Sequence, residues 1–299
     1  MRNYIHDAVV RGLKDTKGHP LNPPYVAEHE TVYQVLTGST AYGVSSDTSD
    51  MDIISISMPV IEDIIQTPIL GFDSTPTYFK TWQHHHIQDP DKRKEYDFSV
   101  YGLPFFFKLA SECNPNIIDC LFVPDEYVLY HDKIGEMIRA NRHLFLSKAA
   151  YPKFIGYSCS QYKKLKNGMK NGRKSESRQS DINEHGYDLK FAYHTARLLE
   201  EGIQILNEGD LDLQKSRKLL KSIRNGDWEF KDFDEYYNTT KSRISKAVEN
   251  SDLPEKPRMG RIRNLLVECI EHRHGDMNTE TSAEIYKEKL KQISLIVNK

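Results

Sequence analysis

Short apolar runs separated by turn residues fill the chain up to about Tyr130. Some of these runs are rich in β-branched and aromatic residues, which favour strands. We therefore expect strands over residues 32–36, 51–57 and 95–101. Two further runs, residues 103–112 and 116–122, have helical spacing and are separated by Asn114-Pro115, a pair that disfavours helix. This mixture of strands and helices predicts an α+β domain.

Beyond about His131 the apolar positions recur at helical spacing, and no strand alternation is visible. Helices are predicted over residues 133–145, 154–165, 186–207, 214–224, 233–249, 258–272 and 282–297. Between them, the polar segment 166–180 is typical of a loop and the segment 251–257 of a linker. The expected fold class is α+β, with a small mixed-sheet domain over residues 1–130 and an all-helical domain over residues 131–299.

Composition narrows the classes of protein. The net charge of −2 predicts no general attraction to nucleic acid or to anionic membranes, so a polyanion would need a local basic patch. The four cysteines, Cys113, Cys120, Cys159 and Cys269, form no Cys-x-x-Cys pair, which argues against a zinc site or a disulfide framework. The first residues resemble no signal peptide and no apolar run could span a bilayer, so a cytoplasmic protein is expected.

The most informative stretch runs from Leu36 to Asp52. A predicted strand leads into Gly38-Ser39, where the glycine permits a tight turn and the following N–H groups, with the Ser39 hydroxyl, can bind phosphate oxygens. A second strand then opens with Asp50-Met-Asp52, and alternation along a strand places both carboxylates on one face. Adjacent carboxylates repel each other unless a cation lies between them, and magnesium prefers such oxygen ligands.

The combination of a strand, Gly-Ser, a short spacer and Asp-x-Asp is similar to the nucleotidyltransferase motif of the DNA polymerase β superfamily. The variant GSTAYG…SDMD resembles in particular the predicted nucleotidyltransferases linked to RNA repair. Helices matching FIGYSCSQYKKL and GYDLKFAYHTARLLEEGIQILNEGDLDL extend the resemblance over roughly residues 30–215. It gives no role to residues 215–299.

The resemblance implies a third carboxylate on a later strand, which falls on Asp97. The neighbouring Asp89, Asp91 and Glu95 lie in a more polar stretch that is typical of a loop. It further implies that Asp50, Asp52 and Asp97 hold two divalent ions, Mg²⁺ or Mn²⁺. The implied reaction moves a nucleoside monophosphate from an NTP to an acceptor hydroxyl, with an RNA 3′ end as the favoured acceptor. Asp97 would serve as a ligand or as a general base, and the sequence does not separate the two roles.

Three basic residues, Lys190, His194 and Arg197, share one face of a predicted helix, nearly opposite its apolar stripe. Periodicity alone favours a solvated face. The family has the same three residue types on the matching helix, and this resemblance favours a nucleotide-binding role beside Gly38 and Ser39. The run His84-His85-His86 is expected in a surface loop, because consecutive residues chelate a metal poorly.

A basic cluster that includes Lys170, Arg173 and Lys174 crowds the predicted loop. Charge runs are usually solvated, but this one contrasts with the slightly acidic chain, so we expect it to follow the phosphate backbone of an RNA acceptor. Two other functions stay open: modification of a protein or small molecule, and a non-catalytic nucleotide- or RNA-binding module. The sequence indicates neither the NTP nor the oligomeric state.

Overall fold

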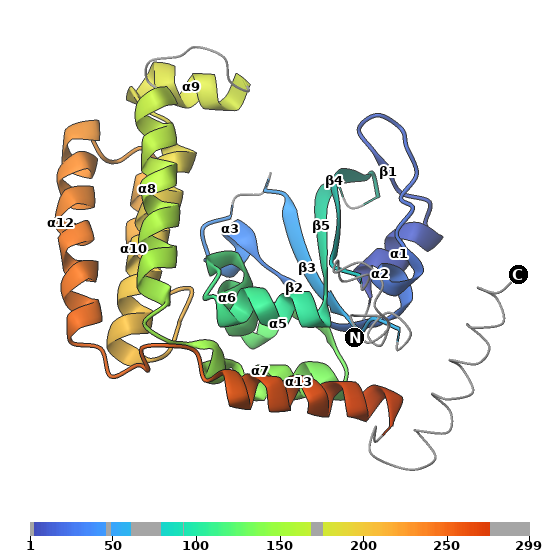
Figure 1. The fold of residues 1–299 in the computed structure, drawn as a ribbon. Helices are drawn as coiled ribbons and strands as arrows, with labels where there is room; N and C mark the ends of the chain where they lie inside the picture. Colours follow the sequence, from blue (N-terminus) through green and yellow to red (C-terminus); the bar gives the residue numbers. More distant parts are fainter. Residues whose placement is uncertain (1–2, 46–48, 61–78, 92, 169–175, 276–299) are drawn as a thin grey trace, which may run out of the picture.

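The computed structural model of the chain describes residues 3–45, 49–60, 79–91, 93–168 and 176–275 (Figure 1). The predicted helix over residues 282–297 lies outside the described residues. So do Lys170, Arg173 and Lys174, the three residues singled out for RNA binding. The structure therefore leaves that part of the acceptor prediction as it stands.

A six-stranded mixed sheet forms the first part of the protein, in the order β1-β4-β5-β3-β2-β6. The strands are β1 (Lys14–Asp15), β2 (Thr31–Leu36), β3 (Met51–Ser57), β4 (Thr81–Asp89), β5 (Lys94–Gly102) and β6 (Val128–His131). Only the central pair β3–β5 is parallel, and the other pairs are antiparallel. The predicted strands are thus confirmed as β2, β3 and β5, and the predicted α+β fold class is confirmed with them.

Helices cover both faces of this sheet (Figure 1). Helices α1 (Tyr4–Val10) and α2 (Tyr25–His29) pack on one face, against a core that includes Ile53 and Phe98. Helices α5 (Leu103–Ser111) and α6 (Pro115–Phe122) cover the other face, where the core includes Ile56. Strand β2 is buried at every position because it has neighbours on both faces and both edges.

The rest of the described chain is helical apart from the edge strand β6. Its helices are α7 (Lys133–Ala140), α8 (Ala150–Gly168), α9 (Glu176–His185), α10 (Leu189–Glu208), α11 (Arg217–Arg224), α12 (Phe230–Glu249) and α13 (Met259–His274). Helix α10 is the central one, since it packs against α8, α11 and α12. These helices and one face of the sheet share a continuous hydrophobic core. The short helix α3 (Gly38–Ala41) lies between β2 and β3 in the chain and contacts this region, where the Gln214 amide donates to the Ala41 carbonyl at 3.3 Å.

Two of the helices stay with the sheet. Helix α7 packs on β2, and the last described helix, α13, returns to pack on α5 and α7 (Figure 1). The chain leaves the sheet region before α8 and comes back before α13. These two crossings touch each other, because the Lys148 N–H donates to the Pro254 carbonyl (2.9 Å) and the Lys148 ammonium pairs with Glu255 (2.6 Å).

Two local predictions are wrong. The histidines at 84–86 lie on strand β4 and not in a loop; the strand was hidden because its outward positions are polar. The segment 166–180 is not a single loop, because α8 continues to Gly168 and α9 begins at Glu176. Among the described residues, no helix is long and apolar enough to cross a membrane.

Candidate active site

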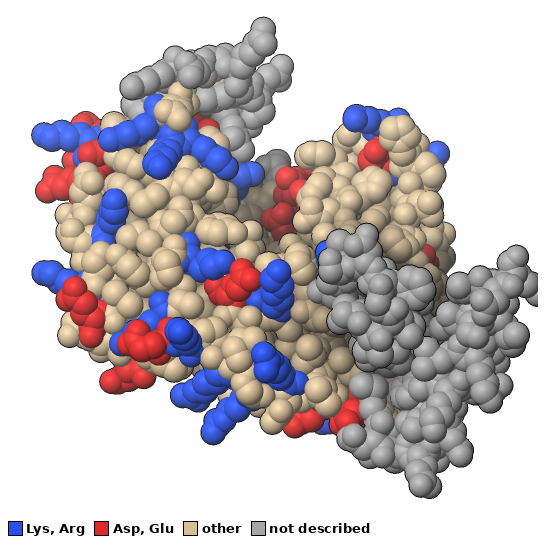
Figure 2. Space-filling model, in the orientation of Figure 1, with Lys and Arg blue, Asp and Glu red and all other residues tan. Residues whose placement is uncertain are grey.

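The parallel pairing of β3 with β5 brings two distant carboxylates together. In this register Asp52 lies directly beside Asp97, and neighbouring strands are about 4.8 Å apart. Asp50 precedes the first residue of β3 and lines the same cavity of about 320 Å³. Figure 2 shows acidic atoms gathered in the hollow between the sheet and the helices. The structure thus brings the three predicted carboxylates into one cavity.

Gly38 makes room for the Asp52 carboxylate. Its backbone has a φ of +65°, and a Cβ at this position would lie 1.9 Å from Asp52 Oδ2. The preceding residue fixes the strand, because the Thr37 N–H donates to the Asp52 carbonyl at 2.8 Å. Ser39 follows in the first turn of α3 and lines the cavity with Gly38. The predicted pair therefore lies against the carboxylates.

We expect Gly38→Ala to displace the Asp52 carboxylate and to lower nucleotidyl transfer by at least tenfold. Exposed Gly12 provides the matched control, since it has a φ of +63° and a Cβ added there would meet no atom within 4 Å. Both substitutions should cost about 1–2 kcal/mol of unfolding free energy through backbone strain. Urea denaturation measures that shared cost. Equal activity of the two variants would contradict the proposed contact.

Burial and mutual repulsion raise the pKa values of the carboxyl groups in this cavity. Burial, followed by the negative charge of Asp97, raises the pKa of Asp52 to about 6. The pKa of Asp50 is raised as well, by burial and then by Glu95 and Asp97. The ammonium of Lys190 acts in the opposite direction on both groups. Such a cavity holds excess negative charge that a bound cation would neutralise.

The donor set suits a divalent metal ion. Asp50, Asp52 and Asp97 offer carboxylate oxygens, the ligands that Mg²⁺ and Mn²⁺ prefer. Asp97 also belongs to a tighter group, in which ligand atoms of His86, Glu95 and Asp97 lie within 4.8 Å of one another. Its Oδ1 accepts the His86 N–H at 2.8 Å. This hydrogen bond orients the Asp97 carboxylate and leaves its Oδ2 available to a metal ion.

Cationic groups from the helical region face the carboxylates. Lys190 and His194, both on α10, line the cavity. Arg224, at the end of α11, lines it too and lies 5.6 Å from the centre of the Tyr193 ring. Arg224 was missed because nothing in the sequence indicates that α11 folds back toward the carboxylates. His85, also missed, lies on β4 with its Nδ1 at 3.4 Å from Asp97 Oδ2.

Arg197, expected from the resemblance to bind the nucleotide, is buried, although helical spacing places it opposite the apolar stripe. Only 4% of the residue is exposed. Its Nη1 donates to the Asp119 carboxylate, to both Glu201 oxygens at 3.2 Å and to the Tyr42 hydroxyl at 2.6 Å. The helical wheel failed because α10 is covered on several sides. Arg197 ties α10 to α6 and to the loop after α3, which is a structural role.

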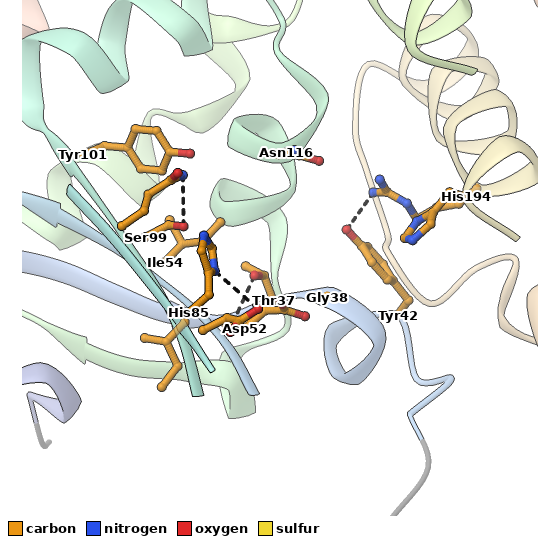
Figure 3. Close-up of a pocket in the computed structure, with 14 residues that line it drawn as sticks. Thr37, Gly38, Tyr42, Asp52, Ile54, His85, Ser99, Tyr101, Asn116 and His194 are labelled. Carbon is orange, nitrogen blue, oxygen red and sulfur yellow. Dashed lines mark hydrogen bonds and ion pairs between the residues drawn. The ribbon is translucent and has the colours of Figure 1, made fainter. Parts of the chain in front are cut away.

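A second cavity, of about 260 Å³ (Figure 3), shares Asp52 and Asp97 with the first. Its floor is the sheet, with side chains of β3, β4 and β5 that include Ile54, Ser99 and Tyr101. Asn116 on α6 and His194 on α10 line its other walls. In contrast with the first cavity, it is lined mainly by neutral polar and aromatic groups.

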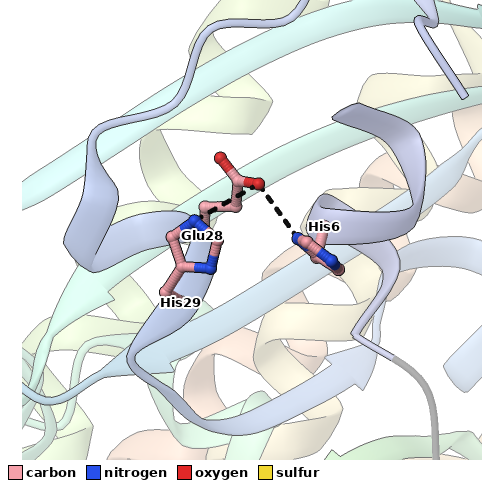
Figure 4. Close-up of side chains that lie close together, drawn as sticks. All are labelled: His6, Glu28 and His29. Carbon is pink, nitrogen blue, oxygen red and sulfur yellow. Dashed lines mark hydrogen bonds and ion pairs between the residues drawn. The ribbon is translucent and has the colours of Figure 1, made fainter. Parts of the chain in front are cut away.

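A separate group of metal-binding residue types lies on α1 and α2 (Figure 4). The Nδ1 of His6 lies 3.0 Å and the Nε2 of His29 lies 3.5 Å from Glu28 Oε1. Both imidazoles are well exposed. The contact from His6 joins two short helices, so a hydrogen bond that links α1 to α2 accounts for the group.

Comparisons with known proteins identify a family and two similar proteins. The model of a family described as "RNA repair pathway DNA polymerase beta family" matches residues 23–268. An uncharacterized 38.9 kDa protein from the nrdC-mobD intergenic region of Enterobacteria phage T4 is 29% identical over 146 residues. That match covers 48% of this chain and only 40% of the phage protein. The crystal structure of a nucleotidyltransferase-like protein from Exiguobacterium sibiricum 255-15 is 8% identical, with a TM-score of 0.28. The match covers 92% of this chain and 87% of that one.

The family match spans most of the chain and includes every element that lines the two cavities. It supports a nucleotidyltransferase-like function for the site built by β3, β5 and α10. The chain belongs to the RNA repair pathway DNA polymerase beta family.

Proposed function

We propose that the protein is a metal-dependent nucleotidyltransferase that moves a nucleoside monophosphate from an NTP to the 3′ hydroxyl of an RNA. The observation that carries this proposal is the register of β3 and β5, which sets Asp52 beside Asp97 in a cavity that also holds Asp50 and Lys190. Carboxylates facing cations across one cavity can hold metal ions and a polyphosphate together.

In the proposed reaction the acceptor hydroxyl oxygen forms a bond to the α-phosphorus of the NTP. The bond from that phosphorus to the oxygen bridging the β-phosphate breaks, and pyrophosphate leaves with both electrons of the bond. The hydroxyl proton passes to the Asp97 carboxylate. Divalent ions bound by Asp50, Asp52 and Asp97 would lower the pKa of the hydroxyl and offset the charge of the triphosphate.

The triphosphate is assigned to the cavity of Asp50 and Lys190. Gly38 and Ser39 lie at its edge, and Lys190, His194 and Arg224 face them from the helices. Cations in this position offset the charge that builds on the leaving pyrophosphate. Figure 2 shows that Lys and Arg atoms also gather on the helical side of the hollow, above the acidic atoms.

The test is to incubate the protein with Mg²⁺, each labelled NTP in turn, and either total RNA or a lysate treated with ribonuclease. We expect label in RNA with at least one NTP. Label in protein or in small molecules, with none in RNA, would replace the acceptor by one of those classes. No label in any fraction, despite NTP binding, would favour a non-catalytic binding module.

Lys190→Ala should weaken NTP affinity without changing stability. Lys190 is exposed, so its loss removes no core packing. A lost charge-assisted hydrogen bond to phosphate costs about 1.5–3 kcal/mol, which is roughly ten- to a hundredfold in Kd. Equilibrium dialysis with a labelled NTP and Ca²⁺ measures the affinity, and Lys241→Ala on α12 is the control. Equal affinity of the two variants would return Lys190 to a solvated surface role.

A further inference from the structure

The two cavities follow one another along the strands. Side chains two residues apart on a strand share a face, and each residue advances about 3.3 Å. Asp50, just before β3, and Asp52 on β3 line the first cavity, whereas Asp52 and Ile54 line the second. On β5, Asp97 lines both and Ser99 only the second. The carboxylates therefore stand at the junction, with one cavity on each side of them along the strand direction.

The charges of the two cavities differ. The first has Lys190 and Arg224 opposite its carboxylates. In the second, the cationic Arg197 is already engaged with Asp119 and Glu201. Beyond the shared carboxylates, most of the other polar groups are amides, hydroxyls, the phenols of Tyr42 and Tyr101 and two imidazoles. A polyphosphate would find few charge partners there, whereas a flat neutral group with hydrogen-bonding edges would find several.

In the proposed transfer, the acceptor hydroxyl and the leaving pyrophosphate lie on opposite sides of the α-phosphorus. Attack on the α-phosphorus is in line with departure of pyrophosphate, so the acceptor hydroxyl must arrive from the side opposite the leaving group. Since pyrophosphate is assigned to the cavity of Lys190, the acceptor arrives through the second cavity. At about 260 Å³ this cavity lies below the roughly 300–1,000 Å³ of drug-sized ligand pockets, which suits one nucleoside and not an oligonucleotide.

We infer that the second cavity binds the terminal nucleoside of the RNA acceptor and selects the RNA by its last base; this inference rests on the proposed function. The Gln83 amide donates to Ser99 Oγ at 3.3 Å and forms a second hydrogen bond with the Tyr101 side chain. These two contacts hold the amide toward the cavity. Asn116 lines the other wall (Figure 3). Side-chain amides carry both a donor and an acceptor and can pair with base edges. The Tyr101 ring offers a surface on which an unpaired base can stack.

The experiment uses four RNA oligonucleotides that differ only in the 3′-terminal base. We expect the wild-type kcat/KM for labelled transfer to differ at least tenfold between the best and worst acceptors. Gln83→Ala and Asn116→Ala should each lower kcat/KM for the best acceptor by about ten- to a hundredfold, since a paired base edge contributes about 1–3 kcal/mol. In these variants the kcat/KM values of the four RNAs should lie within about threefold of one another. Both side chains are exposed, so the variants should fold.

Asn238→Ala, an exposed position on α12, is the control and should keep the wild-type preference. Four equal wild-type values, or a preference that survives in both variants, would overturn the base-selecting role and leave the proposed transferase intact. A loss of NTP affinity in Gln83→Ala and Asn116→Ala, measured by dialysis without RNA, would instead assign the cavity to the nucleoside of the NTP and overturn the inference. No transfer to any of the four RNAs would overturn the proposed function together with it.

Discussion

Asp52→Asn should abolish nucleotidyl transfer, lowering it by at least a thousandfold, while the protein stays folded. The change keeps the shape of the side chain but removes a negatively charged ligand beside Asp97. Loss of one ligand of a two-metal site removes several kcal/mol of transition-state stabilisation. Labelled transfer measures the activity, and Asp252→Asn on an exposed loop is the matched control. Activity at the wild-type rate would show that the metal ions bind elsewhere.

The same variant should be more stable than the wild type without metal. The pKa of Asp52 is about 6 in the folded protein against 3.8 for an ordinary aspartate, so its charged form opposes folding above pH 6. At about 1.4 kcal/mol per pKa unit, the penalty reaches about 3 kcal/mol at pH 7 and fades as the pH falls toward 4. Urea denaturation in EDTA should show Asp52→Asn gaining about 1–3 kcal/mol at pH 7 and little at pH 4.

Metal binding gives the complementary result. Protons compete with a cation for Asp52, so the affinity of the wild type for Mn²⁺ should fall as the pH drops below about 6. Electron paramagnetic resonance of free Mn²⁺ measures this without any substrate. An affinity that does not change between pH 7 and pH 5 would remove Asp52 from the set of ligands.

Arg197→Met should destabilise the protein by about 3–5 kcal/mol, because removing one partner of a buried ion pair leaves charge without compensation. The guanidinium is the shared partner of Asp119 and Glu201, both of which are buried. Burial raises the pKa of the Asp119 and Glu201 carboxyl groups. At acid pH these groups should take up protons in the variant, and the loss of unfolding free energy should become smaller. The loss should therefore be largest near pH 7 and smaller near pH 4.

Urea denaturation at the two pH values measures this effect. Lys190→Ala, seven residues earlier on the same helix, is the control, and its exposed side chain should cost almost nothing. A double variant, Arg197→Met with Asp119→Asn, should recover part of the loss because one unpaired charge is gone. An unchanged unfolding free energy in Arg197→Met would show that these buried ion pairs contribute no net stability.

The local sequence pattern predicted the strands whose residues are mostly apolar and buried. Strand β3 was located to the residue because it is strongly apolar and begins directly at the carboxylates. Strand β4 was not predicted, because only Ile87 and Asp89 of its residues are buried and its other positions are polar or partly exposed. An edge-like strand of this kind shows too little alternation to be recognised.

Some residues of the candidate site could be predicted from the local sequence pattern, and others depend on how distant segments pack together. Asp50 and Asp52 could be predicted as neighbours because two residues on one strand obey a fixed period. Asp97 was assigned by resemblance, since no local pattern states that β5 pairs with β3 in parallel or in which register. Arg197 was misplaced because a helical wheel assumes one buried face, whereas α10 contacts α8, α11 and α12. Arg224 depends on tertiary packing alone.

The paired crossings at Lys148 and Pro254 restrict how the hollow between sheet and helices can open. With a single connecting segment, side-chain packing alone would hold the helices α8 to α12 against the sheet. Here two segments run past each other and are joined by a backbone hydrogen bond and an ion pair. Such a double connection resists twisting of α8 to α12 against the sheet. The buried contacts of Arg197 with Asp119 and Tyr42 add a third link, so the spacing between α10 and the carboxylates is set by packing throughout the fold and not by one connecting segment.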